Sequence, residues 1–274
     1  MSRCGTTSTK PAANRNLSRC RSITRCISFI PAAPTGIPKC IIHGTGGVLL
    51  THLKEHGLHA DLNREDCLFY YTTCGWMMWN WLVSVLAIGA TAVLYDGSPF
   101  HPGPERLIDL IDAEKISVFG TSPKFLTTLE KSGLQPRLSH DLGSLKGLIS
   151  TGSPLSPQSY DYVYREIKAE LCLSSMSGGT DIVSCFVIGN PVLPVRRGEM
   201  QCKSLAMAIE VWDDQGRPLI GEKGELVCTG TFLPCPSGCG MTRNSKNCAP
   251  RISASSPACG HRVTMPSNAP TAAC

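Results

Sequence analysis

Two glycines, a hydroxyl and a carboxylate stand in consecutive positions within residues 174–184, SSMSGGTDIVS. Gly178 and Gly179 carry no Cβ atom, so a polyanionic ligand can approach their backbone closely. Thr180 and Asp181 then supply two hard oxygen atoms, the kind of ligand that Mg²⁺ prefers. We therefore interpret this stretch as a candidate loop for a phosphate group and its metal ion. The alternative is a plain turn between two buried segments, because these residue types also favour turns.

The charge of the chain is unevenly distributed. The 274 residues carry a net charge of +5, yet all 21 Asp and Glu lie between Glu55 and Glu225. Six of the 26 Lys and Arg fall in residues 1–34 and four in residues 231–274, which leaves 16 bases against 21 acids in the middle. The basic ends lack the interleaved aromatic residues of nucleic-acid-binding arms, so we expect no nucleic-acid partner.

Cysteine is concentrated in the same two ends, which hold eight of the 15. Four of these cysteines and His261 lack the compact CxxC spacing typical of zinc sites. The Arg-rich, acid-free start has the composition of a mitochondrial transit peptide but not its apolar face. The other seven cysteines are scattered, and no secretory signal is recognisable. This pattern favours a reducing compartment, and we expect a cytoplasmic protein.

Apolar residues predict strands that alternate with helices. The predicted strands are 40–44, 90–95, 116–120 and 145–150, and the predicted helices are 46–56, 77–88, 104–114, 124–131 and 157–169. This alternation is typical of βαβ units with a parallel sheet, and residues 206–229 add a hairpin-rich β region. In the first helix we expect Val48, Leu49, Leu50 and Leu53 on the buried side. His43, just before it, is either a general base or a structural residue.

The most apolar run is residues 69–95, of which residues 76–94 have nearly membrane-spanning length. Asn80, Ser84 and the Gly-Ala-Thr break at residues 89–91 argue against a span, as does the absence of flanking Lys or Arg. We therefore expect no membrane span, but a buried helix at residues 77–88 followed by a buried strand at residues 90–95.

Two polar loops follow predicted elements of the sheet: TGSP at residues 151–154 and GGTD at residues 178–181. In open α/β sheets ligands bind in the crevice outside the carboxyl ends of the strands. We expect both loops to lie at one such crevice.

Five motifs in this order resemble the adenylate-forming superfamily, which includes the acyl-CoA synthetases: TGIPK at residues 35–39, CGW at 74–76, TGSPL at 151–155, SGGTD at 177–181 and GELV at 224–227. Within the superfamily, residues 35–230 are most similar to the acetoacetate–CoA ligase branch. The resemblance implies an α/β fold: a fragment of the large N-terminal domain, with a parallel sheet flanked by helices plus a small β region. It also implies ATP-dependent ligation of acetoacetate to CoA through an acyl-adenylate.

The resemblance assigns nucleotide contacts to two loops. Thr35, Gly36 and Lys39 would be the end of the loop that holds the ATP phosphates. Gly152-Ser153-Pro154 would line the adenine and acyl pocket.

The resemblance also assigns the metal and the acyl group. Thr180, next to Gly178 and Gly179, would contact phosphate. Asp181 would hold Mg²⁺ at a position where relatives carry Glu, and Trp76 would shape the acyl pocket. These roles suit the chemistry, because N–H donors and a metal ion offset the charge that develops on a leaving pyrophosphate.

The chain departs from the family at both ends of this region. Residues 31–36 read PAAPTG where the family has SSGTTG, and the two prolines lack N–H donors. After Gly230 the family's ribose-binding aspartate and its lid domain with a catalytic lysine are missing. We expect weak triphosphate binding and little or no activity from this chain.

Parts of both flanks, residues 16–33 and the residues from 232 onward, yield family-like peptides when back-translated and read in a shifted frame. We therefore interpret both flanks, residues 1–34 and 231–274, as out-of-frame and expect them to be disordered, with residues 35–230 forming a partial adenylation domain. The competing hypothesis is a non-catalytic frameshifted or pseudogene fragment with at most weak nucleotide binding.

Overall fold

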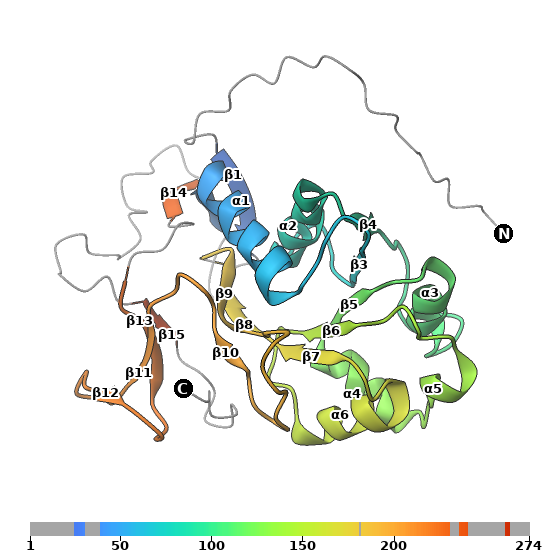
Figure 1. Ribbon diagram of the computed structural model, residues 1–274. Helices are drawn as coiled ribbons and strands as arrows, with labels where there is room; N and C mark the ends of the chain where they lie inside the picture. The colour runs from blue at the N-terminus through green and yellow to red at the C-terminus, as the bar shows by residue number, and fades with distance from the viewer. Residues whose placement is uncertain (1–24, 31–38, 181, 231–235, 241–260, 264–274) are drawn as a thin grey trace, which may run out of the picture.

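The computed structural model describes residues 25–30, 39–180, 182–230, 236–240 and 261–263 (Figure 1). Side chains are described for residues 43–180 and 182–230. Thr35, Gly36 and Asp181 therefore lie outside the described residues, and so do the side chains of Lys39 and of the zinc ligands considered above. Residues 1–34, whose composition resembles a transit peptide, also lie outside the described residues except for residues 25–30.

A five-stranded parallel sheet forms the centre of the fold, in the order β4-β3-β5-β6-β7. The strands are β3 (Cys67–Tyr70), β4 (Thr91–Val93), β5 (Val118–Thr121), β6 (Gly147–Ser150) and β7 (Cys172–Ser175). In register, Leu148 of β6 pairs with Phe119 of β5 and with Leu173 of β7. The predicted parallel sheet is thus confirmed.

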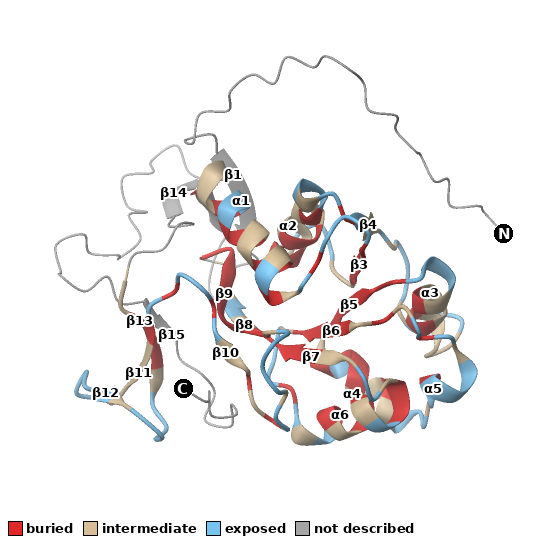
Figure 2. Ribbon diagram, viewed as in Figure 1, coloured by how far each residue is buried: buried red, intermediate tan, exposed pale blue. Residues whose placement is uncertain are grey.

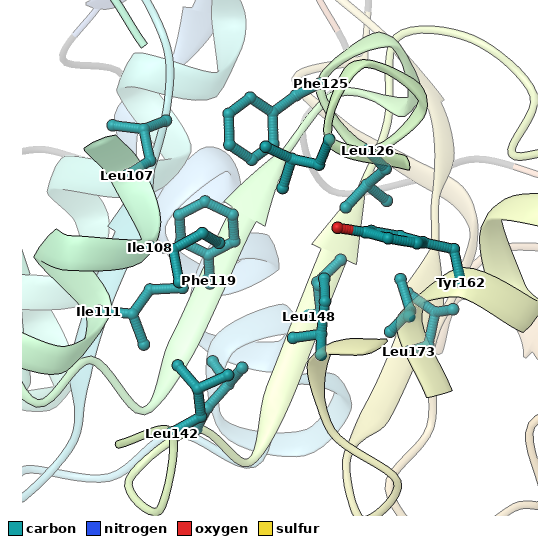
Figure 3. Packing of buried hydrophobic residues seen from close by; sticks show 14 of the residues in the cluster. Leu107, Ile108, Ile111, Phe119, Phe125, Leu126, Leu142, Leu148, Tyr162 and Leu173 are labelled. Carbon is teal, nitrogen blue, oxygen red and sulfur yellow. The ribbon is translucent and has the colours of Figure 1, made fainter. Parts of the chain in front are cut away.

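One face of the sheet is covered by α3 (Arg106–Glu114), α4 (Pro123–Lys131) and α6 (Pro157–Tyr162), which continues as the π-helical turn η3 (Val163–Ile167). Phe119, Leu148 and Leu173 point to this face and pack in one apolar cluster (Figure 3). The helices start where the sequence signals a start: the Ser122 and Ser156 side chains accept N-terminal backbone N–H groups, each before a proline. The short helix α5 (Pro136–Ser139) completes this side.

The other face is covered by α1 (Thr45–Lys54) and α2 (Met77–Ser84), which pack with Leu68, Val118 and Ile149 of the sheet. Helix α2 continues as the 3₁₀ turn η2 (Val85–Ile88), so the predicted helix at residues 77–88 is confirmed, and it is buried except near its end, where Leu86 is 62% exposed. The strand after it is shorter than predicted, and Thr91 is exposed, because β4 lies at the edge of the sheet. In the described part of the chain no helix has the length and apolarity to cross a membrane.

The predicted buried side of the first helix is wrong in part. Helix α1 continues as the π-helical turn η1 (Glu55–His59), and its buried side carries Val48 but otherwise polar residues, namely Thr51, His52, Glu55, His56 and His59. Leu49 and Leu50 are 39% and 56% exposed. A polar helix face can be buried where each group finds a hydrogen-bond partner, and these partners come from distant segments, as described below.

The described residues also form three smaller antiparallel sheets. The first contains β8 (Ser177–Gly179), β9 (Ser184–Ile188) and β10 (Cys202–Lys203); the second contains β11 (Ile209–Trp212), β12 (Pro218–Leu219), β13 (Glu225–Cys228) and β15 (His261–Val263); the third contains β1 (Arg25–Ile30), β2 (Lys39–Gly44) and β14 (Pro236–Gly240). The second sheet confirms the predicted hairpin-rich region. Figure 2 shows that burial is concentrated in the central sheet, the helices beside it and β9.

Candidate functional site

The TGSP loop lies at the carboxyl edge of the central sheet, beside the segment that leads into β8. Strands β6 and β7 are parallel neighbours that end at Ser150 and Ser175. The Thr151 hydroxyl donates to the Met176 carbonyl oxygen at 2.8 Å, and the Met176 N–H donates to the Ser150 carbonyl oxygen at 2.8 Å. These bonds bring the start of the TGSP loop next to the segment that leads into β8.

Trp76 lies against the TGSP loop. Gly152 is exposed and has a φ of +97°, and a Cβ built there would stand 3.7 Å from the ring of Trp76. The Trp76 ring also packs edge-on against Tyr70, with ring centroids 5.9 Å apart. Ser153 and Pro154 are exposed beside Gly152. The arrangement offers an aromatic wall, an open backbone and exposed polar groups in one place, which fits a ligand with planar and polar parts.

Two buried hydroxyl groups end the neighbouring strands. Thr121 and Ser150 are register partners at the ends of β5 and β6, and their hydroxyl oxygens make no hydrogen bond within the described part of the chain. They add hydrogen-bonding capacity at this edge of the sheet.

Glycine is required at position 178 by strand pairing, and not only by the close approach of a polyanionic ligand that we expected from the sequence. Gly178 belongs to β8, which pairs with β9, and a Cβ there would clash with the Ser184 carbonyl oxygen and stand 2.8 Å from the Cys185 Cα. Strand pairing therefore already requires glycine at this position. Gly179 ends the same strand, and the half-buried Thr180 follows it in the turn to β9.

The sequence analysis missed a cluster of buried polar side chains on α1 and η1. His52, Glu55, His56 and His59 recur at the spacing of one helix face, and each is buried. The Glu55 side chain accepts from Ser184, Cys185 and Trp81, and His52 donates to the Val183 carbonyl oxygen at 2.8 Å. The regular His and Glu spacing was the available signal.

Burial disfavours the charged form of the three histidines on this face. Burial lowers the pKa of His52 and of His59, and it lowers the pKa of His56 to about 3, with the neighbouring His52 acting in the same direction. His59 has the partners of a neutral imidazole: it donates from Nδ1 to the Gly189 carbonyl oxygen at 2.7 Å and accepts the Leu205 N–H at Nε2 at 3.1 Å.

A cavity of about 190 Å³ lies on the α2 side of the sheet and reaches its amino edge. Gly147 and Cys172, the first residues of β6 and β7, line it together with Trp81 and Lys146. The Lys146 ammonium donates to the Asp66 carboxylate at 2.9 Å. The cavity wall contains neither Trp76 nor Gly152 nor Thr180, so the cavity is separate from the two loops.

Comparison with known proteins agrees with this geometry. Residues 34–233 match the family described as AMP-binding enzyme. The chain is 57% identical over 202 residues to Acetoacetyl-coenzyme A synthetase of Rhizobium meliloti (strain 1021), covering 74% of this chain and 31% of the relative. It is 44% identical over 211 residues to Malonamoyl-CoA synthetase vrtB of Penicillium aethiopicum, covering 70% of this chain and 29% of the relative.

A solved structure gives the same result. Acetoacetyl-CoA Synthetase from Streptomyces lividans superposes with a TM-score of 0.73 at 41% sequence identity, covering 77% of this chain and 33% of that chain. The chain thus spans about a third of the length of these relatives. The family match covers most of the chain and the fold agrees with it, so the chain belongs to the AMP-binding enzyme family.

Proposed function

We propose that residues 35–230 form part of the adenylation domain of an acetoacetate–CoA ligase. The reaction joins acetoacetate to AMP from ATP and then transfers the acyl group to CoA. The observation that carries this proposal is the meeting of three family motifs at one edge of the sheet: Trp76 lies against Gly152, and the TGSP loop is hydrogen-bonded to the segment that leads to Thr180.

In the adenylation step a carboxylate oxygen of acetoacetate attacks the α-phosphorus of ATP, and the bond to pyrophosphate breaks. Trp76 bounds the acyl group and excludes water from it, while Gly152, which has no Cβ, leaves the space beside the indole open. The Thr180 hydroxyl donates a hydrogen bond to a phosphate oxygen. Asp181 would hold Mg²⁺, and the charge of that ion would stabilise the leaving pyrophosphate.

We expect the 274-residue chain to catalyse this reaction slowly or not at all. Pro31 and Pro34 remove two N–H donors from the phosphate loop that ends with Thr35, Gly36 and Lys39. We propose that residues 1–34 and 231–274 are read in a shifted frame, and sequencing the DNA across codons 30–36 and 228–236 tests this. A missed base at each junction assigns the site to a longer ligase. A faithful sequence favours the competing hypothesis, a non-catalytic fragment with at most weak nucleotide binding.

Two further assignments belong to the same proposal. The enzyme is cytoplasmic, because the scattered free thiols of the middle region suit a reducing compartment. Acetoacetate is the preferred acid, although the relative named for malonamoyl-CoA makes malonamate the competitor to test, since both are short acids with a carbonyl at the third carbon.

Binding of a non-hydrolysable acyl adenylate tests the site without requiring a triphosphate loop. We expect the acetoacetyl-sulfamoyl adenosine analogue to bind the purified chain and to compete with AMP in isothermal titration calorimetry. Gly152→Ala places a Cβ at a positive φ beside Trp76, so we expect weaker binding of the analogue. Gly133→Ala has the same backbone strain at φ +70° in open space and should leave binding unchanged. Equal effects of the two substitutions would count against the site.

A further inference from the structure

The Glu55 carboxylate joins two elements that carry the proposed ligand contacts. Its Oε1 accepts the Ser184 hydroxyl at 2.6 Å and the Cys185 N–H at 3.2 Å. Its Oε2 accepts the Trp81 Nε1–H at 2.9 Å. The side chain is 0% exposed, so these bonds form away from solvent. Each oxygen therefore holds a different element: Oε1 holds β9 and Oε2 holds α2.

His52 holds Val183, the residue just before Ser184 and Cys185, in the turn between β8 and β9. Its Nε2–H donates to the Val183 carbonyl oxygen at 2.8 Å, and its Nδ1 lies 2.9 Å from the Ser84 hydroxyl oxygen of α2. Val183 has a φ of +48°, a conformation that is strained for a β-branched residue. Since strained backbone persists only where its surroundings enforce it, the His52 bond is part of what holds this turn.

The held positions are close in sequence to the proposed contacts. Val183 lies three residues after Thr180, and Trp81 lies on α2 five residues after Trp76, the N-cap residue of that helix. We propose that Glu55, supported by His52, is a positioning residue that fixes α2 relative to the β8–β9 hairpin. It thereby sets the spacing between the acyl contact at Trp76 and the phosphate contact at Thr180. This inference rests on the proposed function.

A change in this spacing should weaken most the ligands that occupy both contacts at once. AMP or acetoacetate alone needs only one of the two elements in place. An acyl adenylate spans them, so a small change in their spacing weakens it more than either part. A residue that only stabilised the fold would change the binding of all three ligands by the same factor.

Glu55→Gln tests this with the smallest change of shape. Whichever way the amide is turned, its NH₂ group faces an N–H donor, either that of Trp81 or that of Cys185, so the bond to one element is lost. We expect the affinity of the acetoacetyl-sulfamoyl adenosine analogue to fall by about tenfold or more, equivalent to about 1.4 kcal/mol. The affinities of AMP and acetoacetate should each stay within about twofold. Trp81→Phe, which keeps the buried ring but removes its donor, should give the same pattern.

Tyr162→Phe is the matched control. It removes another buried hydrogen bond, from the Tyr162 hydroxyl to the Leu134 carbonyl oxygen at 2.8 Å, on the far face of the sheet. It should leave the ratio of the three affinities unchanged. Equal losses for all three ligands in Glu55→Gln would overturn the inference while leaving the proposed function intact. Failure of the unmodified chain to bind any of them refutes the proposed function itself.

Amide hydrogen exchange gives an independent readout on the full chain. In Glu55→Gln and in Ser184→Ala the Cys185 amide and its neighbours in β9 should exchange faster, while amides of β5 and β6 keep their rates. Ser184→Ala keeps the test open if the Gln variant does not fold. Unchanged exchange in β9, or an equal increase throughout the molecule, would overturn the positioning role.

Discussion

Mild acid should destabilise this fold through its buried histidines. Burial lowers the pKa of His56 from the ordinary 6.5 to about 3 in the folded protein. Below pH 6.5 the unfolded chain therefore binds a proton at His56 that the folded chain does not bind. The part of the free energy of unfolding that depends on neutral His56 is fully present above pH 6.5, and it is lost progressively as the pH falls toward 3.

The magnitude follows from the size of this shift. Each pH unit between the two pKa values costs about 1.4 kcal/mol for one group, so His56 alone removes about 2 kcal/mol between pH 6.5 and pH 5. His52 and His59 also have lowered pKa values, because of burial, and they act with the same sign. A loss of this size is a large part of the stability of an ordinary domain.

Urea unfolding of the chain and two variants between pH 7.5 and pH 5 measures the effect. His56→Gln keeps an N–H donor for the Trp81 carbonyl oxygen, which His56 holds at 2.9 Å, but it cannot titrate. As the pH falls below 6.5, the free energy of unfolding of this variant should decrease less steeply than that of the unmodified chain. The difference is the slope that one proton contributes, about 1.4 kcal/mol per pH unit. His101→Gln, at an exposed loop position, should keep the slope of the unmodified chain. Identical slopes for all three proteins would refute the reasoning.

Two further substitutions test the packing of the fold by chemical unfolding. Leu148→Ala removes a side chain that is 1% exposed in the middle of β6 and should cost about 2–5 kcal/mol, whereas Leu138→Ala, 70% exposed, should cost less than about 0.5 kcal/mol; similar losses would contradict the core assignment. Gly178→Ala should abolish stable pairing of β8 with β9 because its Cβ meets the Ser184 backbone, whereas Gly57→Ala meets nothing within 4 Å and should be neutral or stabilising by up to about 1 kcal/mol. A tolerated Gly178→Ala would show that the hairpin is paired differently.

The parts of the fold that could be predicted from the sequence are those with a local cause. Residues 145–150 contain three large apolar residues and precede a turn, and Ser156 followed by Pro157 marks the start of a helix, so β6 and α6 were both identified. Alternation of such elements was enough to indicate the parallel sheet. The ligand edge followed from general topology, because parallel strands place the loops after β6 and β7 together.

The buried face of α1 could not be predicted in the same way. Leu49 and Leu50 are the more apolar candidates, but the helix buries His52 and Glu55, whose partners Val183 and Ser184 lie about 130 residues away. Local hydrophobicity contains no information about such partners, and without them burial of these groups would be costly. The role of Gly178 was missed for the same reason, since its neighbour in β9 is set by tertiary pairing.

The most direct test of the proposed function is a chimera. Residues 35–230 of this chain replace the aligned region of the Rhizobium meliloti acetoacetyl-coenzyme A synthetase, to which the chain is 57% identical. We measure acetoacetate-dependent exchange of pyrophosphate into ATP, with Asp181→Ala in the same chimera as the inactive control. The account predicts exchange within about tenfold of the parent enzyme, a loss of no more than about 1.4 kcal/mol in transition-state stabilisation, and none above background in the control. A folded chimera without exchange, or one that is unaffected by Asp181→Ala, would contradict it.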